Sequence, residues 1–371
     1  TTTGIFIDLH SYGGDVLSPW GFNPQAPPDG PAILAFARRL AYLNGYDARL
    51  GSLYTVDGST KDFAYGERGL IGHTIELGTD FFEECPVFES TVLPDNLPVL
   101  RYAARAARAP FEQPQGPEVV APAATPSVVA PGGVVQLAAL VDDTRFEPGS
   151  GEPTQAIVGA DAYVDVPPWA PGAVAAPLAA ADGAFDATAE TVAADLDTTG
   201  WAEGRHLVWL VGEDASGRRG VPAAVFVWVL DPATAPHVAG RVTSAGDGSP
   251  VAATVSAGPF TATADGAGHY DLMVTEGTYD LAVSAPGYGP ATVAGVVATA
   301  GATTTVDVAL VPYVELLADD VEGGNLGWTA AGAWAITAEA SASPTHSWTD
   351  SPGGQYPNNA NTALTSPALD L

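Results

Sequence analysis

Two short apolar runs near the N-terminus predict strands of an α/β sheet. Residues 5–9 read Ile-Phe-Ile-Asp-Leu, too few for a helix, and are followed by His10 and the turn sequence Ser-Tyr-Gly-Gly. We expect this run to be a central strand of a parallel sheet, covered on both faces. Residues 70–77 predict a second buried strand, with Glu76 near its end. Ligands of open α/β sheets bind beyond the carboxyl ends of strands, so His10 is a candidate metal ligand or proton carrier, or an ordinary polar residue that ends the strand.

Two helical patterns accompany these strands. The first opens at Asp29-Gly30-Pro31 and closes at Gly45, with apolar residues on one face. The second runs from about residue 95 to residue 108, with Leu97 and Leu100 among its candidate packing residues. Two strands and two helices cannot close a doubly wound core, so we expect the missing strands to precede this sequence.

From residue 114 the pattern changes to short apolar strands separated by turns, which is typical of β-sandwiches. The clearest strands of the first sandwich are expected at residues 134–141, 162–166, 206–211 and 225–230. A second small sandwich is expected over residues 236–312. Residues 313–371 are aromatic, acidic and rich in turns, as expected for part of a third β domain.

Composition narrows the functional classes. The 371 residues suffice for two to four domains, and the hydrophobic fraction of 46% is ample for packed cores. A formal charge of −30, from 43 acids against 13 bases, argues against binding nucleic acid or an anionic membrane surface. No stretch is apolar for long enough to span a membrane. Cys85 is the only cysteine, so an internal disulfide is excluded. The abrupt opening and ending suggest a fragment of a longer protein.

Four pieces of the first 110 residues, taken in order and spacing, resemble the C-terminal half of the zinc carboxypeptidases of the A/B type. They are residues 7–12 (Ile-Asp-Leu-His-Ser-Tyr), 18–21 (Ser-Pro-Trp-Gly), 53–65 (Leu-Tyr-Thr-Val-Asp-Gly-Ser-Thr-Lys-Asp-Phe-Ala-Tyr) and 74–78 (Thr-Ile-Glu-Leu-Gly). The resemblance implies that residues 1–113 are the C-terminal half of a mixed-sheet catalytic domain.

The resemblance also implies roles for single residues. His10 takes the place of the third zinc ligand and Glu76 that of the general base. Tyr54 matches the tyrosine that closes over bound substrate and contacts its terminal carboxylate. Ser11 and Tyr12 belong to the substrate-binding region. The Ser11–Tyr12 and Pro19–Trp20 peptides match positions where the family has cis bonds.

Lys61, the only lysine of the chain, matches the residue at the bottom of the pocket for the C-terminal side chain of the substrate. A cation there would favour substrates that end in Glu or Asp. Alternatively, Lys61 reaches solvent, or it neutralises a neighbouring acid such as Asp57 or Asp62.

The chain departs from the family in what it lacks. In the family, the His-Ser-Tyr motif is preceded by the first two zinc ligands, which form an early His-x-x-Glu. It is also preceded by the arginines that bind the substrate carboxylate and the oxyanion. This sequence contains none of these residues. His73 and Glu76 do form a His-x-x-Glu, but residues three apart on a strand point to opposite faces, so we expect His73 to be a packing residue. We therefore expect this chain alone to bind zinc poorly and to hydrolyse nothing.

The β part resembles accessory domains of secreted bacterial peptidases. Residues 116–232 look immunoglobulin-like, and residues 236–312 look like the transthyretin-like, carboxypeptidase-regulatory type. Residues 313–371 resemble the start of a jelly-roll domain. Four acids of that last segment could bind calcium or form a solvated acidic surface. They are Asp319, Asp320, Glu322 and Asp350.

These observations predict a multidomain protein, partly α/β and then all-β. The leading hypothesis is a fragment of a secreted zinc metallocarboxypeptidase that acts on the C-termini of peptides or proteins, with its β domains available for attachment to a cell surface or cell wall. One alternative is an adhesion or binding module that carries an inactive peptidase remnant. Another is a cell-wall peptide amidase on the same fold. The parent's upstream His-x-x-Glu and arginines would discriminate an enzyme from a binding module.

Overall fold

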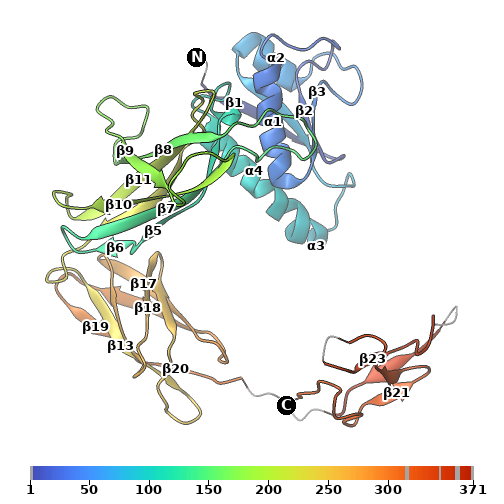
Figure 1. Ribbon diagram of the computed structural model, residues 1–371, viewed down its shortest axis with the longest axis vertical. Coiled ribbons are helices and arrows are strands. Elements are labelled where there is room, and N and C mark those ends of the chain that lie inside the picture. The colour runs from blue at the N-terminus through green and yellow to red at the C-terminus, as the bar shows by residue number, and fades with distance from the viewer. Residues whose placement is uncertain (1–2, 314–316, 342–343, 356–359, 369–371) are drawn as a thin grey trace. The chain divides into compact units, whose positions relative to one another are not determined.

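The computed structural model describes residues 3–313, 317–341, 344–355 and 360–368, and their regular secondary structure is mostly β-strand (Figure 1). They form two compact units. The first holds the chain up to Val238 together with Met273–Thr278 and Val297–Thr304. The second holds Ala239–Leu272, Tyr279–Val296 and the described residues after Thr305.

The N-terminal sheet is mixed rather than parallel. It has the order β1 (Ile5–His10), β4 (Ile71–Glu76), β2 (Asp15–Ser18) and β3 (Asp47–Leu50). β1 is parallel to β4 and β2 is parallel to β3, but β2 is antiparallel to β4. The expectation that residues 5–9 form a central, fully covered strand is wrong. β1 pairs only with β4 among the described strands, and Leu9 is 49% exposed because none of these strands pairs with the outer side of β1.

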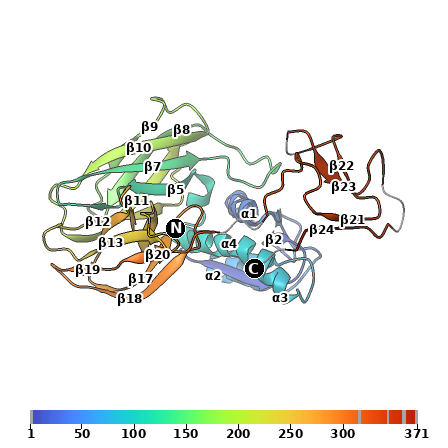
Figure 2. The same ribbon diagram turned by 90° about the horizontal axis from the view of Figure 1, so that it is seen from below.

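The helices of this part pack on the sheet and on one another. They are α1 (Gly30–Asn44), α2 (Thr60–Arg68), the short α3 (Cys85–Val87) with a π-helical turn at Phe88–Val92, and α4 (Leu93–Ala106). α1 ends at Gly45, as expected. The left-handed backbone conformation of Gly45 lets its N–H donate to the Ala41 carbonyl. α1 and α4 lie side by side in both views (Figures 1 and 2). The sequence patterns did not predict α2.

One face of α4 is packed and the other is open. Val99, Tyr102 and Ala106 are buried against α1 and the sheet. Leu97 and Leu100 are exposed, so the expectation that they pack is wrong: they lie on the helix face opposite the buried one.

The first β-sandwich follows a 3₁₀ turn at Gln113–Gln115. Its sheet order is β5-β7-β10-β9-β8-β11-β12-β6, and a buried aliphatic cluster fills its interior. The strands are β5 (Glu118–Thr125), β6 (Val128–Val129), β7 (Val134–Asp142), β8 (Ile157–Val164), β9 (Ala176–Ala180), β10 (Ala189–Asp197), β11 (Gly204–Asp214) and β12 (Ala223–Val229). The four strands expected from the sequence correspond to β7, β8, β11 and β12.

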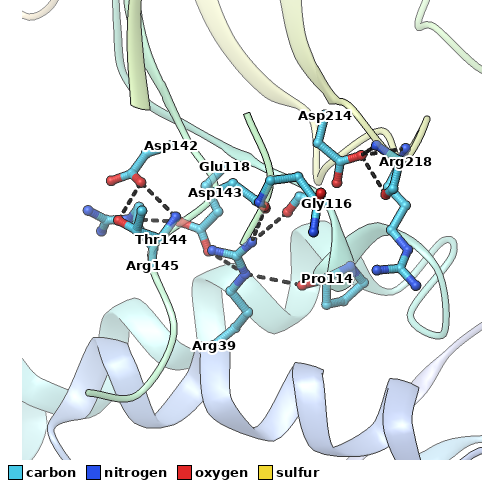
Figure 3. A network of polar contacts seen from close by, with 12 residues as sticks. Arg39, Pro114, Gly116, Glu118, Asp142, Asp143, Thr144, Arg145, Asp214 and Arg218 are labelled. Carbon is cyan, nitrogen blue, oxygen red and sulfur yellow. Dashed lines mark hydrogen bonds and ion pairs between the residues drawn. The ribbon is translucent and has the colours of Figure 1, made fainter. Parts of the chain in front are cut away.

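The α/β part and this sandwich belong to one compact unit, and Arg39 of α1 joins them (Figure 3). Its guanidinium is fully buried and donates to the carbonyl oxygens of Pro114 and Gly116, at 3.1 and 2.6 Å. It also lies 3.5 Å from Asp143 and 3.9 Å from Glu118. A salt-bridged cation on the helix therefore fixes the start of the sandwich against α1.

The remaining strands form smaller sheets. One has the order β16-β13-β19, with β20 pairing with β13, and another has the order β15-β14-β17-β18. Their bounds are β13 (His237–Ser244), β14 (Thr254–Ala257), β15 (Phe260–Thr263), β16 (His269–Met273), β17 (Gly277–Ser284), β18 (Ala291–Ala298), β19 (Thr303–Thr305) and β20 (Val308–Leu310). Two two-stranded sheets follow, β21 (Thr329–Ala331) with β24 (Ala363–Thr365), and β22 (Ala335–Thr337) with β23 (Ser347–Thr349). Among the described residues, no helix is long and apolar enough to cross a membrane.

Candidate functional site

The parallel pairing of β1 and β4 brings His10 and Glu76 to the same edge of the sheet. The two residues are direct partners in the strand register, each at the carboxyl end of its strand. The Leu77 N–H then donates to the His10 carbonyl at 2.9 Å, which extends the pairing one step past the strands. Neighbours in register on parallel strands project to the same face, so this edge places an imidazole beside a carboxylate.

A small cleft of about 120 Å³ collects four of the residues singled out from the sequence. They are His10, Tyr54, Lys61 and Glu76, and they come from two strands, the loop before α2, and α2 itself. The other lining residues are Leu17, Ser52, Leu53, Val56, Ser59 and Thr74. Tyr54, which lies on a loop, is 75% exposed.

Ser11 and Tyr12 do not line this cleft. Ser11 lies in a neighbouring depression with Phe81 and donates to the Phe81 carbonyl at 3.3 Å. The ring of Tyr12 packs edge-on against Phe81, with centroids 4.9 Å apart. The Ser11–Tyr12 and Pro19–Trp20 peptides are both cis, as the family resemblance implied.

Asp8 orients the His10 ring. His10 Nε2 lies 3.1 Å from Asp8 Oδ2, which also accepts a hydrogen bond from the Thr60 hydroxyl. Nδ1 of His10 makes no hydrogen bond with any described residue and is therefore available as a ligand atom. A carboxylate on the other ring nitrogen is the usual support for a metal-binding histidine. The sequence reading missed Asp8, although the two-residue repeat of a strand places it on the same face as His10.

Glu76 has the electrostatics of a proton acceptor. Burial raises the pKa of its carboxyl above the ordinary value, and His10 opposes that shift, while Asp15 and Asp8 add to it. A carboxylate whose pKa lies closer to neutrality is a better general base near pH 7. The strand end thus holds Glu76 in a partly dehydrated position.

Lys61 is buried, with 1% of its surface exposed, and does not reach solvent. Its Nζ lies 3.4 Å from both Asp62 Oδ1 and Ser59 Oγ. Burial lowers the pKa of the ammonium group, and Asp62 opposes that shift. The Asp62 carboxylate also accepts the Gly21 N–H, at 3.0 and 2.8 Å to its two oxygens. Lys61 therefore lines the cleft and shares the Asp62 carboxylate with the Gly21 N–H.

His73 is a core residue, as expected. It is fully buried, its Nδ1 lies 3.1 Å from the Ser18 hydroxyl, and its ring packs edge-on against Phe36. Burial lowers its pKa to about 3, so the ring is neutral at physiological pH. A neutral imidazole in contact with an aromatic ring is a packing element.

The residues present do not by themselves fit a zinc ion. A catalytic zinc site uses about three protein ligands, whereas this edge of the sheet offers His10 as one. The described residues hold no group of three or more His, Cys, Asp or Glu side chains placed to bind a metal.

In the last segment, three of the four acids considered for calcium accept hydrogen bonds from groups of the chain itself. Asp319 accepts from the Val321 N–H and the Trp328 indole, Asp320 accepts from the Glu322 N–H, and Glu322 itself accepts from Thr345.

Several solved structures share low similarity with this chain. A type II cohesin–X-dockerin complex from Acetivibrio cellulolyticus matches at 18% identity and a TM-score of 0.18, over 24% of this chain and 64% of that one. The fibronectin(III)-like modules of Clostridium thermocellum CbhA match at 14% identity and a TM-score of 0.19, over 31% and 97% of the two chains. The group B streptococcus pilus 2b backbone protein matches at 11% identity and a TM-score of 0.18, over 52% and 97%. Similarities this low carry no argument about function.

The sequence comparisons are more specific. No curated protein matches the chain. The family model that matches does not cover residues 1–113, so the resemblance of that part to zinc carboxypeptidases stays a prediction. The expected carboxypeptidase-regulatory type of residues 236–312 is confirmed: a carboxypeptidase regulatory-like domain is found at residues 237–311.

Proposed function

We propose that this chain is the later part of a secreted zinc metallocarboxypeptidase, followed by accessory β domains. The observation that carries the proposal is the single cleft that holds His10, Tyr54, Lys61 and Glu76. The carboxypeptidase regulatory-like domain downstream supports it, because that type of β-sandwich takes its name from carboxypeptidases, although it is not itself catalytic.

In this proposal each side chain has one task. Glu76 takes a proton from a water molecule that attacks the last peptide bond of the substrate, and then passes it to the leaving amine. His10, held by Asp8, would supply one zinc ligand, and the remaining ligands would have to come from residues outside this sequence. Tyr54, exposed on its loop, closes over the bound C-terminus.

Lys61 sets the proposed substrate preference. Lys61 lines the cleft and is 1% exposed, so a substrate ending in Glu or Asp that reached its ammonium group would gain an ion pair, while one ending in Lys or Arg would be repelled. Asp62 compensates part of the Lys61 charge, which limits the preference. The proposed partners are therefore the C-termini of peptides or proteins, in an extracellular setting where the β domains attach the enzyme to a surface.

The test is Glu76→Gln in the longer protein that carries the remaining zinc ligands. Release of the C-terminal residue from a synthetic peptide should fall by about 10²- to 10⁴-fold because the base is lost. Zinc content measured by mass spectrometry should stay unchanged, because Glu76 is not a ligand. Glu67→Gln on the exposed face of α2 is the matched control and should keep full turnover.

Two outcomes would contradict the proposal. Full turnover in Glu76→Gln would remove Glu76 from the mechanism. A parent protein without the upstream His-x-x-Glu and arginines, and without turnover on any peptide, would favour the binding module with an inactive peptidase remnant.

A further inference from the structure

Three arginines gather around one cavity in the first unit, although the chain as a whole is strongly acidic. The cavity has a volume of about 400 Å³ and is lined by α4, β5 and the start of β12. Arg101 and Arg105 lie one turn apart on α4, and Arg145 comes from the loop after β7. The chain has only twelve arginines and one lysine, against 43 acids. A quarter of its arginines at one cavity therefore calls for an electrostatic explanation.

These arginines keep donors to spare. Arg101 is exposed and makes no hydrogen bond or ion pair with any described residue. Arg105 uses Nε to donate to the Pro222 carbonyl at 3.1 Å, which leaves its two terminal nitrogens. Arg145 donates from Nε to Glu118 at 3.1 Å, and Figure 3 shows this pair beside the Arg39 network. Guanidinium forks of this kind match the oxygens of carboxylates and phosphates.

A buried hydroxyl adds a second, independent observation. Tyr102 lines the cavity, is 3% exposed, and its hydroxyl has no hydrogen-bond partner in the part of the chain that the structure describes. Burial and the Glu118 carboxylate raise the pKa of this hydroxyl, and the guanidinium groups of Arg39, Arg105 and Arg145 oppose that shift. Native proteins rarely leave a buried hydroxyl unpaired, because the lost hydrogen bond to water is not replaced. An acceptor oxygen of a bound anion would complete it after a small shift of the flanking side chains.

The charges and walls of the cavity indicate the class of ligand. Glu118 is the only acidic residue in the lining, and it already pairs with Arg145, so the cavity has an excess of positive charge. Apolar side chains form the rest of the wall. They are Leu43, Pro98, Val119, Val120, Ala121, Pro122, Ala223 and Ala224. The space exceeds what an inorganic oxyanion alone would fill.

We propose that this cavity binds a small organic oxyanion, with its charged oxygens toward Arg101, Arg105 and Tyr102 and its apolar body against the aliphatic wall. The oxyanion is a phosphate monoester or a dicarboxylate, since either supplies the two negative charges that match the excess. The site lies apart from the cleft that holds Glu76, and the inference does not depend on the peptidase activity.

The experiment uses the whole chain and isothermal titration calorimetry at low salt. The probes are phenyl phosphate, phthalate and, as an uncharged control, benzyl alcohol. Saturable binding of one probe per chain is expected for phenyl phosphate or phthalate and not for benzyl alcohol, and whichever anion binds more tightly identifies the oxyanion. Absence of saturable binding for both anions overturns the proposal.

Variants localise the binding. Arg101→Ser should weaken it about tenfold or more, because a charge-assisted hydrogen bond is lost. Arg218→Ser is the matched control: it removes the same charge from an exposed position of the same unit that does not line the cavity, and should bind as the native chain does. Equal losses in Arg101→Ser and Arg218→Ser would overturn the assignment. Tyr102→Phe should also weaken binding while the chain stays folded, and unchanged affinity would exclude the hydroxyl from the site.

Discussion

Replacing Arg39 with methionine tests how α1 is held to the first sandwich. The guanidinium has no exposed surface, and its partners are the carbonyls of Pro114 and Gly116 and the carboxylates of Asp143 and Glu118 (Figure 3). Methionine keeps much of the apolar stem but leaves Asp143 without its cation, whereas Glu118 keeps its ion pair with Arg145. Both are almost fully buried, Glu118 at 6% and Asp143 at 1% exposure, so solvent cannot compensate.

The expected loss follows from that burial. Breaking a buried ion pair by removing one partner costs about 3–5 kcal/mol, because an uncompensated charge remains. For a unit of this size, each kcal/mol shifts Tm by about 2–4 °C, so unfolding of the first unit should move down by about 6–20 °C. Calorimetry at pH 7.5 is suitable, because the pKa of Asp143 is raised only to about 6 and the carboxylate is then ionised.

Arg38, the next residue on α1, provides the matched control. Among the described residues its side chain forms an ion pair with Glu152 alone, at 2.5 Å, and is 20% exposed. Arg38→Met should therefore cost roughly 1 kcal/mol, close to the range of surface pairs. If Arg39→Met lowers Tm no further than Arg38→Met, the buried guanidinium does not hold the two parts together and the reasoning fails.

Three further changes test other parts of the structure. Burial raises the pKa of Asp143 from 3.8 to about 6, so the folded state binds the proton more tightly than the unfolded state does. This carboxyl should therefore contribute stability that is lost as the pH rises from about 4 to above 6. Asp143→Asn should flatten that part of the Tm–pH curve, and an unchanged curve would reject the assignment. Lys61→Asp in the active parent should lower kcat/KM about 5- to 150-fold for peptides ending in Glu relative to those ending in Arg; an unchanged ranking of Glu, Leu and Arg substrates would show that Lys61 does not set specificity. Gly72→Ala should destabilise the first unit by about 1–3 kcal/mol in denaturant titrations, because the new methyl group would lie 2.6 Å from the Lys61 carbonyl, whereas Gly159→Ala meets open space and should cost little.

The sequence patterns predicted most of the helices and strands but not which strands pair with one another. Alternation and turn residues located four of the eight strands of the first sandwich and the glycine that ends α1, because these signals are local. The position of β1 at the edge of its sheet was not predictable, since its apolar run is compatible with a central strand and strand order depends on pairing far along the chain. α2 was missed because its apolar face is short: only Ala64 and Tyr65 are buried apolar residues on it.

For the candidate site, too, one part could be predicted from the sequence and another could not. The convergence of His10 and Glu76 could be expected, because both are polar residues at the carboxyl ends of strands, and parallel pairing brings such ends together. The environment of Lys61 could not be predicted, because the sequence alone left three possibilities open: solvent, a neighbouring acid, or the cleft. The structure excludes the solvent-exposed environment, but Lys61 has both of the others. It lines the cleft, and its ammonium group pairs with Asp62, whose carboxylate also accepts the Gly21 N–H. A carboxylate with a second donor is only partly neutralised by Lys61 and only partly neutralises it in return, so the ammonium group keeps positive charge to offer a substrate.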